Sequence, residues 1–204
     1  MSKPTLYGAS YSVYVRIIML CLREKGIAFD HREIDIFNPE QTPSDYLQHH
    51  PFGKIPAFEH EGFKLYETSA ITRYIDEAFT GSAPLFPSSI QERARINQII
   101  SILDNYAYPV LVWDIYVEAC EADSPDEEKI SAAIPKAKTC LQALESLCGE
   151  NTYLVGQELS LADIYACPIF SYFLESPQGK DLLPDYPKLE KWWNAVKVYG
   201  DKLQ

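Results

Sequence analysis

The sequence predicts an α/β domain followed by an all-α domain. Short strand patterns alternate with helical patterns over residues 1–80, a segment rich in glycine and proline follows, and only helical periodicity is found beyond it. A length of 204 residues accommodates two small domains, and a hydrophobic content of 47% is enough for their cores. We therefore expect domains over residues 1–80 and 89–204, joined by a linker over residues 81–88.

The first domain is expected to open with a strand, a loop and a helix. Pro4–Tyr7 is typical of a short strand, and apolar residues recur at helical spacing after the next loop until Gly26. These residues are Val15, Ile18, Met19 and Leu22. Phe29–Ile36 predicts a second strand, which lies parallel to the first if the connection is a right-handed crossover.

The rest of the first domain is expected to be a hairpin and a covering helix. Prolines break up the segment that follows the second strand, so only a short helix around Asp45–Gln48 is expected there. Ala57–His60 and Phe63–Tyr66 predict antiparallel strands around a tight turn, and Ser69–Phe79 predicts a helix. The result is a small mixed sheet flanked by helices.

Helical periodicity dominates the second domain, for which we expect a helical bundle. The expected helices are Ser89–Glu121, Asp126–Cys148, Leu161–Leu174 and Pro187–Val198. Pro109 is expected to kink or break the first of them, because proline lacks an amide hydrogen for the helical ladder. Gly149 is expected to end the second helix, and Ser160 to cap the third.

Composition excludes several classes of protein. A formal net charge of −11 argues against nucleic acid and anionic membrane surfaces as partners, because both require a basic surface. No long apolar run and no signal-peptide pattern is present, which predicts a soluble cytoplasmic protein. The five cysteines have no Cys-x-x-Cys or zinc spacing, so we expect buried apolar fillers in a reducing compartment and no metal. They are Cys21, Cys120, Cys140, Cys148 and Cys167.

The most informative stretch is His-Pro-Phe-Gly-Lys-Ile-Pro at residues 50–56, followed by Glu-Thr-Ser-Ala-Ile at residues 67–71. Pro56 removes one backbone donor, and the Ile55-Pro56 bond is among the few that adopt the cis form at modest cost. The backbone of Ile55 would then be unpaired in the sheet and available to an extended ligand by strand addition. The start of the following helix favours a carboxylate. Together these features predict a site for a small peptide with free carboxylates.

These motifs resemble those of the cytosolic glutathione transferases, and the likeness extends over essentially the whole chain. Pro-Phe-Gly-Lys-Ile-Pro resembles that family's cis-proline loop, and Glu-Thr-Ser-Ala-Ile resembles its Glu/Gln-Ser-x-Ala-Ile motif. Ser-Leu-Ala-Asp at residues 160–163 resembles its Ser-x-Ala-Asp helix cap. The resemblance, to the theta/phi-like or bacterial serine-type classes, implies a thioredoxin-like N-terminal domain and a helical-bundle C-terminal domain. It also implies a homodimeric enzyme that conjugates glutathione, its cosubstrate, to small hydrophobic electrophiles.

The resemblance implies roles for individual residues. Ser12 matches the catalytic serine, which donates a hydrogen bond to the glutathione thiolate, and Ser10 and Tyr11 are the alternatives in the same loop. The competing interpretation of Ser12 is a plain helix N-cap, a role that serine fills often. The glutathione-binding residues implied by the resemblance are Lys54, Ile55, Glu67 and Thr68.

Phi-like classes carry a basic pair before the cis-proline loop, and Gln41 and Thr42 stand at those positions here. This departure predicts weaker binding of glutathione, unless His49 and His50 take over the role. Thr68 also replaces the usual serine, which preserves the hydroxyl and adds a methyl group.

For the second, hydrophobic substrate, the candidates are Tyr11, Tyr106 and Trp113, although aromatic residues at helical spacing are more often part of a core. Ser160 and Asp163 are expected to cap a buried helix and to matter for folding. Dimer contacts are expected from Phe52 and from the helices that begin at Ser69 and Ser89.

Two other functions fit the same residues. The first uses the activated thiolate for peroxide reduction, dehalogenation or isomerisation, which depends on the pocket for the second substrate. The second is a non-catalytic module that binds proteins or carries ligands. The presence of Ser12, Lys54, Glu67 and Thr68 favours the enzyme.

Overall fold

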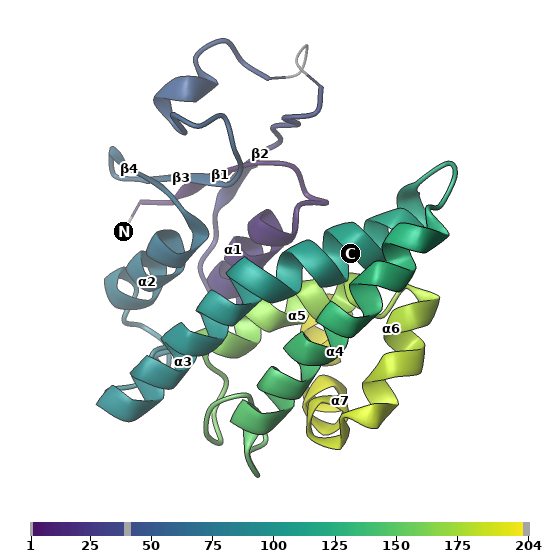
Figure 1. The fold of residues 1–204 in the computed structure, drawn as a ribbon. Coiled ribbons are helices and arrows are strands. Elements are labelled where there is room, and N and C mark those ends of the chain that lie inside the picture. The colour runs from purple at the N-terminus through teal and green to yellow at the C-terminus, as the bar shows by residue number, and fades with distance from the viewer. Residues whose placement is uncertain (1, 39–41, 202–204) are drawn as a thin grey trace. The chain divides into compact units, whose positions relative to one another are not determined.

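The division between the two halves of the chain falls between Leu85 and Phe86. The computed structural model describes residues 2–38 and 42–201, and within these residues every strand lies in the first unit and the second unit is helical (Figure 1). The expected α/β and all-α parts are therefore both present. None of the described helices combines the length and the hydropathy that a membrane span requires.

The sheet of the first unit is mixed and has the strand order β2-β1-β3-β4. The central strand β1 (Thr5–Tyr7) pairs in parallel with β2 (Asp30–Arg32) and antiparallel with β3 (Ala57–His60). β4 (Phe63–Tyr66) completes the hairpin with β3 at the bounds expected from the sequence. The predicted second strand is shorter than expected, because only three of its residues pair with β1.

Helices cover both faces of this sheet. α1 (Val13–Glu24) and α2 (Thr68–Ala78) pack against each other, and Figure 1 shows both below the sheet. The short 3-10 helix η1 (Tyr46–Gln48) lies on the other side, above the sheet in Figure 1. There the buried side chains of Ile34 and Tyr46 form a small core with Ala57. The expected helix-strand pattern of the first domain is confirmed.

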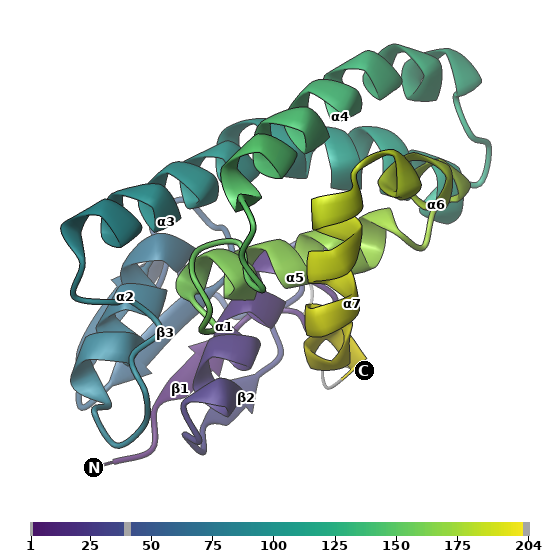
Figure 2. The same cartoon turned by 90° about the horizontal axis from the view of Figure 1, so that it is seen from below.

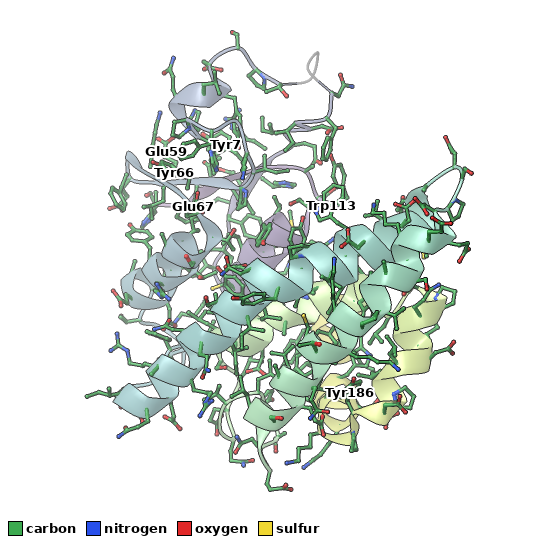
Figure 3. All side chains as sticks on the ribbon, in the orientation of Figure 1. Tyr7, Glu59, Tyr66, Glu67, Trp113 and Tyr186 are labelled. Atoms are coloured by element: carbon green, nitrogen blue, oxygen red, sulfur yellow. The ribbon has the colours of Figure 1, made fainter. Side chains whose placement is uncertain are left out.

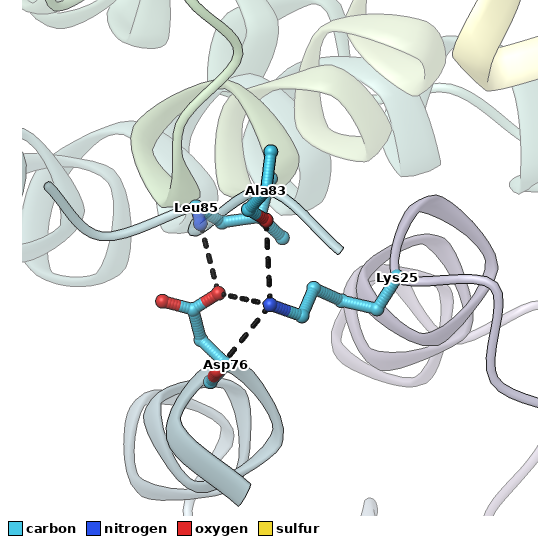
Figure 4. Close-up of polar contacts among 4 residues, drawn as sticks. All are labelled: Lys25, Asp76, Ala83 and Leu85. Atoms are coloured by element: carbon cyan, nitrogen blue, oxygen red, sulfur yellow. Dashed lines mark hydrogen bonds and ion pairs between the residues drawn. The ribbon is translucent and has the colours of Figure 1, made fainter. Parts of the chain in front are cut away.

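A buried ion pair ties α1 and α2 to the end of the first unit. Lys25, just after α1, donates from Nζ to Asp76 Oδ1 at 2.8 Å and to the carbonyl of Ala83 at 3.3 Å. Asp76 Oδ1 also accepts a hydrogen bond from the amide of Leu85 at 2.8 Å (Figure 4). The segment that leaves the first unit is thus held by charge-assisted hydrogen bonds.

The second unit is a bundle of helices in which α5 packs against α3, η2 and α7, while α4 packs against η2 and α7 (Figure 2). In chain order they are α3 (Ile90–Ile102), η2 (Leu103–Glu121), α4 (Glu127–Cys148), α5 (Leu161–Phe173), α6 (Pro177–Leu182), η3 (Leu183–Asp185) and α7 (Pro187–Asp201). Nearly every residue of α5 is buried, which is why its sequence is apolar all round. α6 and η3 were not expected from the sequence.

The chain does not break at Pro109. α3 gives way at Leu103 to the π-helix η2, which continues through Pro109 as far as Glu121. In an α-helix the proline ring clashes with the carbonyl four residues earlier, whereas a π-helix pairs residues five apart. The expected break at Pro109 is therefore wrong, and the observed interruption is a change of helix type six residues earlier.

The expected cap of α5 is confirmed. The Asp163 carboxylate accepts hydrogen bonds from the amide and the hydroxyl of Ser160, each at 2.8 Å. It also accepts from the amide of Leu154 and from Nε1 of Trp192, both at 2.8 Å. Asp163 thus joins the segment before α5 to α7, as a residue of the folded core.

Four of the five cysteines are buried, as expected, and all five are free thiols. Cys120 is the exception, since it is exposed near the end of η2, and the expectation that every cysteine fills a core is wrong there. Burial raises the pKa of the Cys148 thiol to about 11 and raises that of Cys140. Buried thiols of this kind are protonated and chemically inert near neutral pH.

Candidate functional site

The register of the sheet brings the first loop, the cis-proline loop and the Glu-Thr-Ser-Ala-Ile motif to one edge. Tyr7, the last residue of β1, pairs with Ala57, the first of β3, and Ala57 pairs with Tyr66, the last of β4. Directly opposed residues of antiparallel strands lie only about 5 Å apart. The loop after β1, the Ile55-Pro56 step before β3 and the Glu67 turn after β4 therefore meet at this edge. Figure 3 labels Tyr7, Tyr66 and Glu67 there.

Gly8 lets the first loop approach the cis-proline segment closely. A Cβ atom added at Gly8 would overlap with Cγ2 of Val15 and would lie 3.2 Å from Cβ of Ile55. Its φ of +148° is also one that residues with a side chain rarely adopt. The absence of a side chain at this position packs the loop against both α1 and Ile55.

Ser12 stands at the N-cap of α1 without using its hydroxyl as a cap. Its amide donates to the carbonyl of Ala9 and its carbonyl accepts from the amide of Arg16, both at 2.9 Å. Its side chain makes no capping hydrogen bond and has no hydrogen-bond partner among the described residues. An N-cap serine ordinarily accepts a hydrogen bond from the first turn of the helix. The hydroxyl of Ser12 is therefore available to a ligand beside the amides of that turn.

The alternative hydroxyls of this loop already donate to carboxylates. The Tyr11 hydroxyl donates to Asp35 Oδ1 at 2.6 Å, and this bond is the main reason why the pKa of Asp35 is lowered. The Ser10 hydroxyl donates to Glu33 Oε1 at 3.4 Å. Of the hydroxyls in residues 8–12, that of Ser12 is the one that needs no competing bond to be broken.

The Ile55-Pro56 peptide bond is cis, as the motif predicts. The ladder of β3 begins at Ala57, so the backbone of Ile55 lies just outside the paired residues. The Tyr46 hydroxyl donates to the carbonyl of Lys54 at 2.7 Å and so holds the loop from the η1 side. The Lys54 side chain is exposed, with no ion-pair partner in the described part of the chain.

Glu67 and Thr68 form the start of α2. Glu67 is the N-cap and has φ 68° and ψ 112°, a backbone conformation that costs a residue other than glycine of order 1–3 kcal/mol. Its carbonyl accepts from the amides of Ala70 and Ile71, both at 3.0 Å, which leaves the amides of Thr68 and Ser69 ahead of the helical ladder. Free amides at a helix start favour an anion. Thr68 itself is buried.

The two histidines before the cis-proline loop do not form a cationic pair. Burial lowers the pKa of His50, an effect that the negative charge of Glu67 opposes and the positive charge of Lys54 reinforces. His50 is thus neutral near physiological pH. The ring of His49 packs on Tyr7, with centroids 4.4 Å apart, and its Nδ1 lies 3.7 Å from Glu59. Gln41 lies outside the described residues.

The aromatic candidates of the second unit have different surroundings. Tyr106 is 63% exposed and lines an apolar pocket of about 490 Å³ between η2 and α4, to which Pro109 and Cys140 also contribute. Trp113 is 42% exposed and forms a side-chain hydrogen bond with Tyr108, five residues earlier in the π-helix. Trp113 does not line that pocket, and Tyr11 belongs to the first unit.

Sequence reasoning missed a set of residues that bind the first loop. His31, Glu33 and Asp35 alternate along β2 and the segment after it. They contact Gly8, Ser10 and Tyr11 respectively, at 2.7, 2.8 and 2.6 Å. The signal was present, because polar residues at a spacing of two project from one side of an extended segment.

Comparison with known proteins agrees with this geometry. The family model for the glutathione S-transferase N-terminal domain matches residues 6–83, and that for the C-terminal domain matches residues 100–197. Glutathione S-transferase F10 of Arabidopsis thaliana is 30% identical over 197 residues, which cover 94% of this chain and 91% of the relative. Glutathione S-transferase F6 of the same plant is 28% identical over 190 residues, covering 92% and 91%.

Solved structures give the same result. The crystal structure of poplar glutathione transferase F1 has a TM-score of 0.87 and 27% identity, and it covers 100% of this chain and 97% of its own. Glutathione transferase F7 from Populus trichocarpa has a TM-score of 0.84 and 27% identity, with 98% and 99% covered.

A four-stranded thioredoxin-like unit with three loops at one sheet edge, followed by a helical unit, defines a glutathione-dependent transferase. The chain belongs to the glutathione S-transferase family, and its relatives are plant enzymes of the phi type. The resemblance, the fold class and the enzyme class predicted from the motifs are confirmed.

Proposed function

We propose that the first unit binds glutathione at the three-loop edge and that Ser12 donates a hydrogen bond to the thiolate. The observation that supports this role is the Ser12 hydroxyl, which stands at a helix N-terminus without capping it. Ser10 and Tyr11 rank below it, because their hydroxyls donate to Glu33 and Asp35. Ser12 keeps its proton and forms no covalent bond.

The energy required is within reach of these groups. A free thiol has a pKa of about 8.5, and lowering it by about two units requires about 2.7 kcal/mol of preference for the anion. A hydrogen bond to a charged group contributes about 1.5–3 kcal/mol and a helix N-terminus about 0.3–1 kcal/mol. The combined contribution of one hydroxyl and the start of α1 therefore spans the required value.

The peptide part of glutathione is proposed to lie along the cis-proline loop. The backbone of Ile55 pairs with it as an added strand, and Lys54 pairs with the glycine carboxylate. Glu67 and Thr68 hold the γ-glutamyl end, where the free amides of α2 receive its carboxylate. The thiolate sulfur then attacks an electrophilic carbon, so that a C–S bond forms and the leaving group departs with its electron pair.

For the electrophile we propose contacts with Tyr11, Tyr106 and Trp113. All three present exposed aromatic surface, which suits small hydrophobic substrates. Each segment of the chain then has a proposed role. Residues 1–80 bind glutathione, residues 81–88 form the linker, and residues 89–204 contribute the site for the hydrophobic substrate.

A homodimer is also proposed, through Phe52 and the faces of α2 and of the continuous helix formed by α3 and η2. Phe52 is 70% exposed, and its ring packs against Tyr66, which is exposed as well. Sedimentation of the wild type and of Phe52→Ala tests this interface, and an unchanged dimer in the variant would exclude Phe52 from it.

We also propose that the protein is cytoplasmic and that it uses no metal cofactor. Cell fractionation tests the location, and metal analysis of the purified protein tests the metal content.

The central experiment is retention on immobilised glutathione followed by conjugation to a chlorinated nitroaromatic. Ser12→Ala should be retained but should lose turnover, while Ser10→Ala, the matched control in the same loop, should keep it. Equal turnover in the wild type and Ser12→Ala would overturn the role of Ser12. Retention without turnover in every protein would indicate a binding module.

A further inference from the structure

The loop that carries Ser12 is held from the side by one extended segment. His31 Nε2 lies 2.7 Å from the carbonyl of Gly8, which only accepts, so Nε2 carries the hydrogen of this bond. Two residues further along, Glu33 Oε1 accepts from the amide of Ser10 at 2.8 Å. Asp35 accepts from Tyr11 at the next alternate position. Three residues of the loop thus contact three alternate side chains of one extended segment.

The peptide groups of Ser10 are held on both sides. Glu33 accepts from its amide, and Nε of Arg16 donates to its carbonyl at 3.0 Å. Arg16 lies in α1, and its own amide donates to the carbonyl of Ser12. The orientation of the chain two residues before Ser12 is therefore set by one carboxylate and one guanidinium.

The negative charge of Glu33 is unfavourable at this position beside the first loop. The proposed site must bind a tripeptide with free carboxylates and stabilise a thiolate, and a nearby anion opposes both. The net charge of the chain is already −11. The second carboxylate oxygen of Glu33, Oε2, lies 3.5 Å from Nε2 of His31. The position of Glu33 beside the loop is thus explained by its geometry as a hydrogen-bond acceptor and not by its negative charge.

We infer that Glu33 is a positioning residue for Ser12, acting through the amide of Ser10, with Arg16 as its counterpart on the carbonyl. This inference rests on the proposed role of Ser12. It assigns Glu33 no contact with the substrate. When the acceptor is lost, the loop turns and the Ser12 hydroxyl no longer points steadily at the sulfur, so the thiol of bound glutathione ionises less readily.

The test compares Glu33→Ala, which removes the charge and the acceptor, with Glu33→Gln, which removes the charge and keeps an acceptor oxygen. Glu77→Ala is the matched control, because Glu77 is an exposed carboxylate of the same unit without a partner among the described residues. Glu33 is itself half exposed, so that all three variants are expected to fold. Ser12→Ala is measured in parallel.

Three measurements are made: ultraviolet titration for the pKa of the glutathione thiol in the binary complex, steady-state kinetics for kcat and KM for glutathione, and hydrogen exchange of the Ser10 amide. Glu33→Ala should raise the thiol pKa and lower kcat about tenfold, the effect expected when one oriented hydrogen bond to a charged group is weakened, with KM nearly unchanged. The Ser10 amide should exchange faster. Glu33→Gln and Glu77→Ala should match the wild type in all three.

Equal changes in Glu33→Ala and Glu33→Gln would show an effect of charge and overturn the inference. So would an unchanged thiol pKa in Glu33→Ala when Ser12→Ala raises it, and in that case the proposed function stands. If Ser12→Ala itself leaves the thiol pKa unchanged, the role of Ser12 fails and the positioning role of Glu33 fails with it.

Discussion

The ammonium of Lys25 and the carboxylate of Asp76 form an ion pair of 2.8 Å, with only 1% and 4% of the two side chains exposed (Figure 4). Removing two charges from water costs several kcal/mol for each ion, which the pair offsets only with further hydrogen bonds. The carbonyl of Ala83 and the amide of Leu85 supply those bonds. The pair therefore fixes where the segment after α2 runs.

Removing one partner of this pair should destabilise the protein severely. Asp76→Ala leaves the Lys25 ammonium buried without a counter-charge, and we expect a loss of about 3–5 kcal/mol of unfolding free energy. Chemical denaturation followed by circular dichroism measures it. The double variant Lys25→Met with Asp76→Leu should recover much of the loss, since no buried charge is left. A double variant as unstable as Asp76→Ala would contradict this account.

Gly8→Ala should damage the site through packing. The new methyl group overlaps with Cγ2 of Val15 and pushes on Ile55, so we expect about 1–3 kcal/mol of lost stability. Binding of glutathione should weaken, because the first loop and the cis-proline loop are forced apart. Calorimetry of glutathione binding and thermal melting are the measurements. Gly62→Ala is the control, since nothing lies within 4 Å of a Cβ there although its φ of +79° is strained as well. Equal losses of glutathione affinity in both would refute the packing explanation.

Asp163 should affect stability and not chemistry. Its carboxylate accepts from two amides, one hydroxyl and one indole in a buried position, so Asp163→Ala should cost about 3 kcal/mol or more. The specific activity of the folded fraction at low temperature should equal that of the wild type. Asp181→Ala, an exposed acid of α6, should leave stability unchanged. A fall of kcat in folded Asp163→Ala would point to a role beyond the cap.

His50 should make the first unit sensitive to acid. Burial lowers its pKa below the ordinary value of 6.5, so the unfolded chain binds the proton more tightly than the folded one. The contribution of neutral His50 to stability is full above pH 6.5 and falls as the pH drops below that value. Urea unfolding between pH 7.5 and 5, at pH steps of roughly half a unit around the ordinary histidine pKa, should show the loss. His50→Gln should have a flatter pH profile over this range, and identical profiles would exclude His50 as the cause.

Much of the fold was predictable because its signals are local. The hairpin strands, the cis bond before Pro56 and the cap of α5 depend on residues only a few positions apart. The π-helix was not predictable from the sequence. Proline is the only local signal for an interruption, at Pro109, whereas the change of helix type occurs at Leu103. Short helices such as α6 carry too few turns for a periodic pattern.

The chain by itself determined the family, the strands and the longer helices, and the motifs for which we propose glutathione binding, because each of these depends on neighbouring residues. Only the tertiary structure showed which hydroxyls of the first loop already have hydrogen-bond partners. Tyr11 and Ser10 are bound by Asp35 and Glu33, more than twenty residues away along the chain, and Ser12 is not. Such long-range hydrogen bonds arise from the pairing of β1 with β2. They cannot be predicted from the residues of the loop alone.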